Sequence, residues 1–78
     1  MAESNLQTNT FRVISNYLNT NVLVKMKGNR KVKGILTSFD QHLNLILDKA
    51  EEVGENSSKP IGLVLLRGDN VIAISPVG

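Results

Sequence analysis

The sequence predicts a mainly β domain, in which one short N-terminal helix is followed by a five-stranded, strongly bent antiparallel sheet or small open barrel. Apolar residues recur at helical spacing only near the N-terminus, and after Asn21 they alternate with a period of two. Short turn signals separate the alternating segments. Gly34 stands within a predicted strand, where a missing side chain lets a sheet bend sharply or another backbone approach.

The predicted helix follows a flexible N-terminus over residues 1–10 and begins a single domain over residues 11–78. Thr8, Asn9 or Thr10 can cap its first turn. Its apolar residues form one stripe: Phe11, Ile14, Tyr17 and Leu18. A helix of about two turns is unstable alone in water, so this stripe is expected to pack against the sheet.

The predicted strands are joined by short connections. The residues expected to share one face are Val22, Val24 and Met26, then Val32, Gly34 and Leu36, then Leu43, Leu45 and Leu47. Gly28-Asn29 is a turn signal, residues 53–59 are a polar loop, Gly68-Asp69 turns the chain, and Pro76 ends the last strand.

The final two strands are apolar on both faces, over residues 63–66 and 71–74. A small barrel buries only one face, so either another chain pairs with these strands or the N-terminal helix covers them. A 78-residue chain without cysteine has a small core and no disulfide or thiolate metal site. Oligomerisation is therefore the expected route to stability.

The net charge is only +2, which does not predict a strong nucleic-acid footprint for a monomer. Basic residues nevertheless cluster in sequence at Lys25, Lys27, Arg30, Lys31 and Lys33. In an assembly they give a basic region, and the alternative is a solvated strand surface. No apolar stretch approaches the ~20 residues of a membrane span, and the N-terminus does not resemble a secretory signal. A soluble, cytoplasmic protein is expected.

Two polar clusters interrupt aliphatic runs, at residues 40–44 and 67–71. We interpret them as tight turns that hold their side chains in fixed positions. The imidazole of His42 and the guanidinium of Arg67 can stack on a nucleobase, and the amide of Asn44 can read its edge. Alternatively, Asp40 only bonds backbone amides, and Arg67 with Asp69 is an ordinary exposed ion pair.

Other chemistries have little support in the sequence. His42 is the only histidine, so the serines have one possible base for nucleophilic catalysis. Asp40 and His42 lack further clustered metal ligands, and there is no glycine-rich phosphate loop. Only three aromatic residues are present, which disfavours an aromatic sheet surface for stacking bases. No enzyme activity, metal or cofactor is expected.

At these residues the chain resembles the Sm/LSm family, and in particular archaeal Sm-like proteins. The first Sm motif is matched by residues 22–28, Gly34 and residues 39–45, and the second by residues 66–71 with Ile74-Ser75-Pro76 behind it. The resemblance covers residues 11–76. It implies the Sm fold, an SH3-like barrel, closed into a ring of seven copies by pairing between the fourth and fifth strands of neighbours.

The same resemblance implies that single-stranded, uridine-rich RNA binds around the inner rim of the pore, in RNA processing or as an RNA chaperone or scaffold. His42 and Arg67 would then sandwich the base, and Asn44 would bond its edge. Asp69 would hold Asn44 in orientation, and Asp40 would brace the turn. RNA-processing proteins are implied partners. Two rival functions are a ring that only scaffolds proteins and an RNA-cleaving enzyme using His42 and Asp40.

Overall fold

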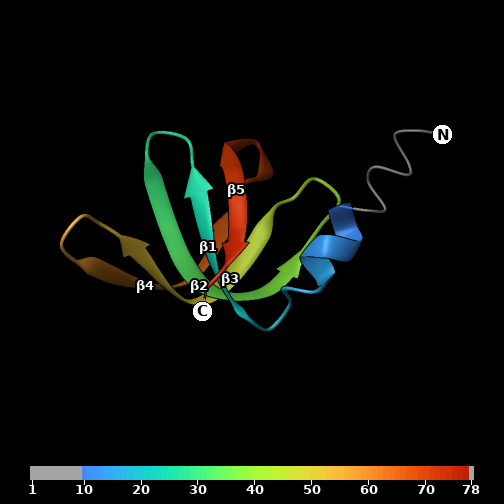
Figure 1. Ribbon diagram of the computed structural model, residues 1–78, viewed down its shortest axis with the longest axis horizontal. Helices are drawn as coiled ribbons and strands as arrows, with labels where there is room; N and C mark the ends of the chain where they lie inside the picture. Colours follow the sequence, from blue (N-terminus) through green and yellow to red (C-terminus); the bar gives the residue numbers. More distant parts are fainter. Residues whose placement is uncertain (1–9, 78) are drawn as a thin grey trace.

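A computed structural model describes residues 10–77 as one five-stranded antiparallel sheet with a helical segment over residues 10–15 (Figure 1). The strands are β1 (Asn21–Met26), β2 (Arg30–Phe39), β3 (Leu45–Val53), β4 (Ser58–Leu66) and β5 (Val71–Pro76). A short 3-10 turn, η1 (Gly68–Asn70), precedes β5. The predicted fold class is confirmed. The expectations for residues 1–9, including a cap at Thr8 or Asn9, lie outside the described residues.

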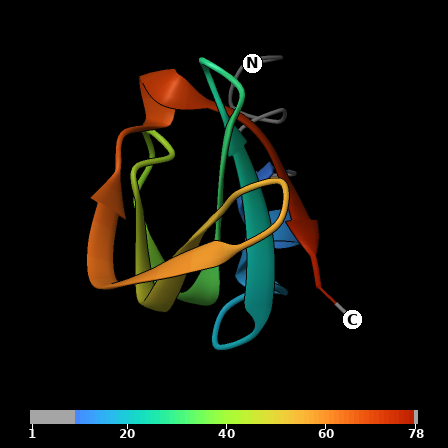
Figure 2. The same ribbon diagram turned by 90° about the vertical axis from the view of Figure 1, so that its left-hand side faces the viewer.

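The sheet bends sharply, so that its strands curl around a central core (Figures 1 and 2). A Cβ added to Gly34 of β2 would stand 3.0 Å from both the Ala50 Cα and the Asp48 carbonyl oxygen of β3. The register between β2 and β3 shifts at the same place, between Lys33 and Ile35. The mid-strand glycine therefore lets a neighbouring backbone approach at the bend, as predicted.

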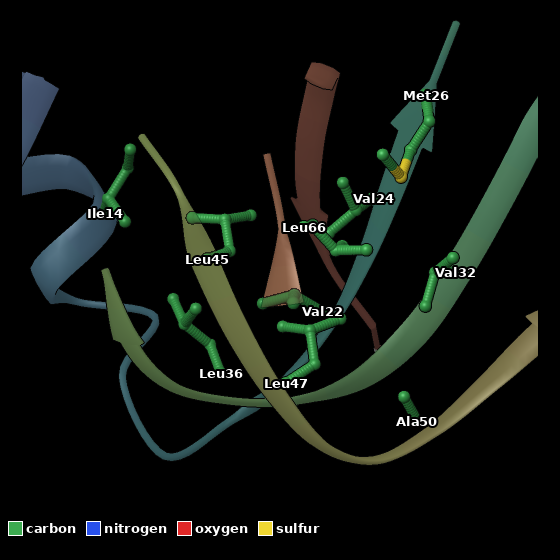
Figure 3. Packing of buried hydrophobic residues seen from close by; sticks show 10 residues of the cluster. All are labelled: Ile14, Val22, Val24, Met26, Val32, Leu36, Leu45, Leu47, Ala50 and Leu66. Carbon is green, nitrogen blue, oxygen red and sulfur yellow. The ribbon is translucent and has the colours of Figure 1, made fainter. Parts of the chain in front are cut away.

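The core lies on the concave side of the sheet, where side chains from the strands converge (Figure 3). The fully buried large side chains are Val22, Val24, Val32, Leu36, Leu45 and Leu47, which confirms the predicted alternation. Ile14 of the helical segment points toward Leu36 and Leu45 and is 6% exposed (Figure 3). Tyr17 and Leu18 lie partly buried against the same cluster. The predicted apolar stripe thus packs on the sheet, with Ile14 in the helical segment and Tyr17 and Leu18 in the turns after it.

Three boundaries differ from the sequence-based expectation. The helix was expected to include Leu18 and to end at residues 19–21, but it ends at residue 15. A series of turns leads to Asn19, which has a left-handed φ of 63° and whose N–H donates to the Leu36 carbonyl at 2.7 Å. The loop predicted over residues 53–59 is limited to residues 54–57, because the ladder of β3 and β4 continues to the Val53–Ser58 pair.

Leu43 was expected to continue the third strand, but it precedes β3 at a φ of 62°. Pro76 is the last residue of β5, at the sheet edge. The hairpin turn between β1 and β2 is as predicted, with positive φ at both Gly28 and Asn29.

Strands β4 and β5 are the two edges of the sheet, whose order is β4-β3-β2-β1-β5. Leu63 and Leu65 of β4 are 69% and 65% exposed, and Ile72 of β5 is 65% exposed. The helical segment instead packs beside β2 and β3 (Figure 1). The alternative in which the helix covers the last two strands is therefore wrong. Among the described residues, no helix is long and apolar enough to span a membrane.

Candidate nucleic-acid interface

The ladder between β3 and β4 brings the two polar clusters together. Leu45 opens β3, Leu66 closes β4, and these residues are register partners. The loop before β3 and the loop after β4 therefore leave the sheet side by side. A hydrogen bond joins them, donated by the Gly68 main-chain N–H to Asn44 Oδ1 at 2.8 Å.

The two loops also touch through their backbones. A Cβ at Gly68 would overlap the carbonyl oxygen of His42, and it would lie 2.9 Å from the carbonyl carbon of Leu43. Only a residue without a side chain fits there, so Gly68 sets the distance between the loops. The sequence indicated only a turn at Gly68. A glycine between two polar residues of a motif was the available signal for such a close approach.

Asp40 holds the first loop in shape. Its Oδ1 accepts hydrogen bonds from the main-chain N–H groups of His42 at 2.9 Å and Asn44 at 3.0 Å. Its Oδ2 accepts one from Asn44 Nδ2 at 3.0 Å. The Asn44 side-chain bond is the main cause that lowers the pKa of Asp40 below its ordinary value, and the two backbone bonds lower it further. Asp40 braces the turn, as predicted.

The side chain of Asn44 is fixed from both sides. Its Oδ1 accepts from Gly68, and its Nδ2 donates to Asp40, so exchanging the two ends of the amide would break both bonds. Among residues 10–77 neither end makes a further hydrogen bond, so each keeps one hydrogen-bonding position for a ligand. The expectation that Asp69 orients Asn44 is wrong, because Asp40 and Gly68 do so. Asp69 instead pairs with Arg67, at 3.5 Å between Oδ2 and Nη2.

Four of the five candidate residues line one hollow of about 460 Å³: His42, Asn44, Arg67 and Asp69. His42 and Arg67 approach it from different loops and are both exposed. The Arg67–Asp69 pair is itself exposed, at 74% and 65% of the side chains, so it contributes little to stability. The site thus offers two planar groups and one fixed amide to a ligand, with Asp40 supporting from behind.

Asp40 contacts His42 through the main chain. Among residues 10–77, no hydrogen bond joins Asp40 to the His42 imidazole, and the Asp40 carboxylate instead accepts from the main-chain N–H of His42 and from Asn44. In the same part of the chain, no three His, Asp or Glu residues are grouped so that they could hold a metal ion.

Comparison with known proteins identifies the family. The LSM domain model matches residues 12–76. An Aeropyrum pernix protein, named for its likeness to the Sm proteins of snRNPs, is 51% identical over 67 residues, which cover 86% of this chain and 87% of that protein.

Two solved structures share the fold. The SmAP1 heptamer of P. aerophilum is 40% identical, with a TM-score of 0.83 over 86% of this chain and 90% of that one. The Sm protein of Pyrococcus abyssii, solved in complex with a uridine heptamer, is 40% identical, with a TM-score of 0.81 over 86% and 96%. Because the family model matches most of the chain, this protein belongs to the LSM domain family of Sm-like proteins.

Proposed function

We propose that this chain forms a homo-oligomeric ring, most simply a heptamer, that binds single-stranded uridine-rich RNA at the inner rim of its pore. Its role would be in RNA processing or as an RNA chaperone or scaffold. The observation that carries the proposal is the hollow in which His42, Arg67 and the fixed amide of Asn44 converge. The heptameric relative and the relative bound to a uridine heptamer support it.

The sheet edges support ring formation. β4 and β5 lie at opposite edges, so each has a backbone row that can pair with another chain. Pairing β4 of one copy with β5 of the next is a head-to-tail contact, which generates a closed ring when its rotation closes. It would also cover exposed apolar side chains, namely Leu63, Leu65 and Ile72.

The amide of Asn44 gives a physical reason for a preference for uracil. Its free Nδ2 hydrogen can donate to a carbonyl oxygen of the base, and its free Oδ1 position can accept from the N3–H. Because Asp40 and Gly68 prevent the amide from flipping, donor and acceptor have fixed places. Cytosine, held in the same orientation between His42 and Arg67, presents its acceptor and donor in exchanged places.

We favour RNA binding without catalysis as the function of this site. The rival scaffold function predicts a ring with no RNA affinity, and it leaves the convergence of His42, Asn44 and Arg67 unexplained. RNA-processing proteins remain the proposed partners, and a cytoplasmic location remains a prediction. The rival RNA-cleaving enzyme predicts turnover that is lost in His42→Ala.

Mass measurement of the intact assembly, with and without heptauridine, tests the proposal. We expect one heptamer mass, and one added heptauridine per ring. Heptacytidine is the matched ligand control, and Asn44→Ala is the matched protein control. A stable monomer would contradict the ring. A ring that takes up no heptauridine would favour the scaffold. A ring that takes up both oligonucleotides equally would contradict the preference for uridine.

A further inference from the structure

A second charged surface lies on the hairpin of β1 and β2, and the proposed function does not use it. Lys25 of β1 and Lys31 of β2 are direct register partners, and Lys33 follows Lys31 on the same outward face. Each of the three lies next to core residues of its own strand and points away from them. We call Lys25, Lys31 and Lys33 the hairpin lysines.

The hairpin lysines have no acidic partner within the described residues. The two ion pairs there are Arg30–Glu52, at 2.9 Å, and Arg67–Asp69. Glu51 is the register partner of Lys33, but it accepts a hydrogen bond from the Ser58 hydroxyl at 2.8 Å. Like charges directly opposite each other destabilise a sheet. A bound anion would relieve the repulsion between Lys25 and Lys31.

A hollow of about 590 Å³ lies beside Lys25 and Lys31, bordered by the β1–β2 hairpin, the loop that joins β3 to β4, and Ile72 of β5. Its basic and polar lining consists of Lys25, Lys31, Arg30 and Asn29, and Glu55 is its one acidic residue. It shares no residue with the hollow of His42 and Arg67. The β1–β2 hairpin and the loop that joins β3 to β4 lie toward the end of the sheet away from the N-terminal helical segment (Figure 1).

We propose that the hairpin lysines and this hollow form a second RNA-binding surface, which holds the phosphate backbone of a single strand without reading its bases. The lining contains no aromatic ring or histidine on which a base could stack. Lysine ammonium groups bind phosphate as compact point charges. Arg30 is already tied to Glu52, so Lys25 and Lys31 are the free cations of the site.

This surface would extend RNA contact beyond the base sites. Each subunit of an assembly presents the same lysines, so a strand longer than the pore rim meets them repeatedly. Backbone contacts of this kind are independent of sequence. They weaken as salt rises, and each phosphate contact to a single strand makes the slope of log affinity against log salt concentration steeper by about 0.7.

An abasic deoxyribose-phosphate 20-mer tests the proposal, because it has phosphates but no bases for the hollow of His42 and Arg67. Its affinity for the full chain is measured across a salt series for the parent, Lys25→Gln/Lys31→Gln and His42→Ala. Lys49→Gln/Lys59→Gln is the matched control, since these two lysines are exposed and lie outside the hairpin. Poly-glutamate of equal charge is the control polyanion, and heptauridine is the base-reading probe.

We expect the hairpin variant to lose roughly threefold or more of its affinity for the abasic strand and to show a shallower salt slope. His42→Ala and the control pair should bind the abasic strand like the parent. Unchanged binding in the hairpin variant, or an equal loss in the control pair, would overturn the proposal. Equal, lysine-dependent binding of poly-glutamate would instead assign the surface to acidic proteins. Because heptauridine is measured separately, failure of base recognition would show in that arm alone.

Discussion

The Gly68 main-chain N–H donates to Asn44 Oδ1 at 2.8 Å, across 24 residues of sequence. Together with the bond from Asn44 Nδ2 to Asp40, this bond fixes the orientation of the amide, and it joins the loop that carries His42 to the loop that carries Arg67. The ligand-facing geometry therefore depends on a glycine that need not contact the ligand. Separate substitutions can remove the close approach at Gly68, the amide of Asn44 or the guanidinium of Arg67.

Gly68→Ala should disrupt the site more than the fold. The new Cβ overlaps the carbonyl oxygen of His42, so the two loops must separate and the bond to Asn44 must lengthen. We expect oligouridine binding to weaken by about tenfold or more, which corresponds to ~1.4 kcal/mol. Gly28→Ala is the control for a glycine replacement outside the site, because Gly28 has a φ of 80° but open space around it. Titration of both variants at fixed salt checks this, and equal losses in the two would contradict it.

Asn44→Ala should remove the preference for uridine. The variant keeps both planar groups but loses the donor and acceptor that face the base edge, at a cost of about 1–3 kcal/mol per base site. Binding of oligouridine and oligocytidine should then become similar. Gln41→Ala, in the same exposed loop, is the control for loop damage. If Asn44→Ala keeps the parent ratio of the two affinities, the amide does not read the base.

Asp40 should contribute stability that depends on pH. The pKa of this carboxyl is lowered in the folded chain, chiefly by the Asn44 side chain, so folding favours the charged form. The contribution is complete above the pKa of a free Asp, about 3.9. It is lost as the pH falls through the lower folded-state pKa.

Thermal unfolding at fixed subunit concentration measures this contribution. The difference in Tm between the parent and Asp40→Asn should be present at neutral pH and should shrink in acid. Glu55→Gln is the control, because Glu55 makes no side-chain hydrogen bond or ion pair among the described residues. A difference in Tm that stays constant down to strongly acidic pH would show that Asp40 acts through shape alone.

The sequence predicted the strands and the glycine bend because alternation directly encodes which face is buried. Val22, Val24 and Leu36 are buried where the pattern placed them. The sequence could also nominate His42, Asn44 and Arg67, because polar residues between aliphatic runs are unusual. It could not assign the partner of Asn44. Asp40 and Asp69 both carry carboxylates, and the conformation of the turn, in which Asp40 also accepts from the Asn44 main-chain N–H, places Asp40 behind the amide.

The boundaries of the helix and the strands were harder to predict from the sequence. The stripe of Phe11, Ile14, Tyr17 and Leu18 is apolar at helical spacing, yet the last two residues pack against the core from turns. Residues 53–59 are polar and suggested a loop, but polar side chains are tolerated on the exposed end of a hairpin. The apolar or polar character of a residue indicates whether its side chain is buried. Burial alone does not distinguish a turn from a helix, or a loop from an exposed strand.

Ile72→Glu should weaken the ring. Ile72 is 65% exposed on the edge strand β5, so the substitution does not remove a core contact of the single chain. A charge placed in the pairing surface must be desolvated when β4 of a neighbour approaches. Val13→Glu is the control, because Val13 is 53% exposed on the helical segment and away from both edges.

Sedimentation equilibrium at micromolar concentration distinguishes the two variants. The Ile72→Glu variant should dissociate at a subunit concentration about tenfold or more above that of the parent, which corresponds to ~1.4 kcal/mol of association free energy per subunit. The Val13→Glu variant should dissociate at the same concentration as the parent. Val71→Lys is a poorer test, because Val71 packs against the core cluster and its loss would also harm the fold. A folded monomer of the parent at this concentration would contradict the ring itself.

Arg67 should act through the shape of its guanidinium as well as through its charge. The guanidinium is planar and stays protonated, whereas a lysine ammonium has no face to lay on a base. Arg67→Lys keeps the charge, so the salt dependence of oligouridine binding should persist while the affinity falls by ~1 kcal/mol per base site. Because the exposed pair with Asp69 contributes little to stability, the fold should be unaffected. Arg67→Gln separates the two contributions, since it removes the charge as well. If Arg67→Lys binds oligouridine like the parent and Arg67→Gln does not, then Arg67 is only a point charge, and the base is not held between His42 and Arg67.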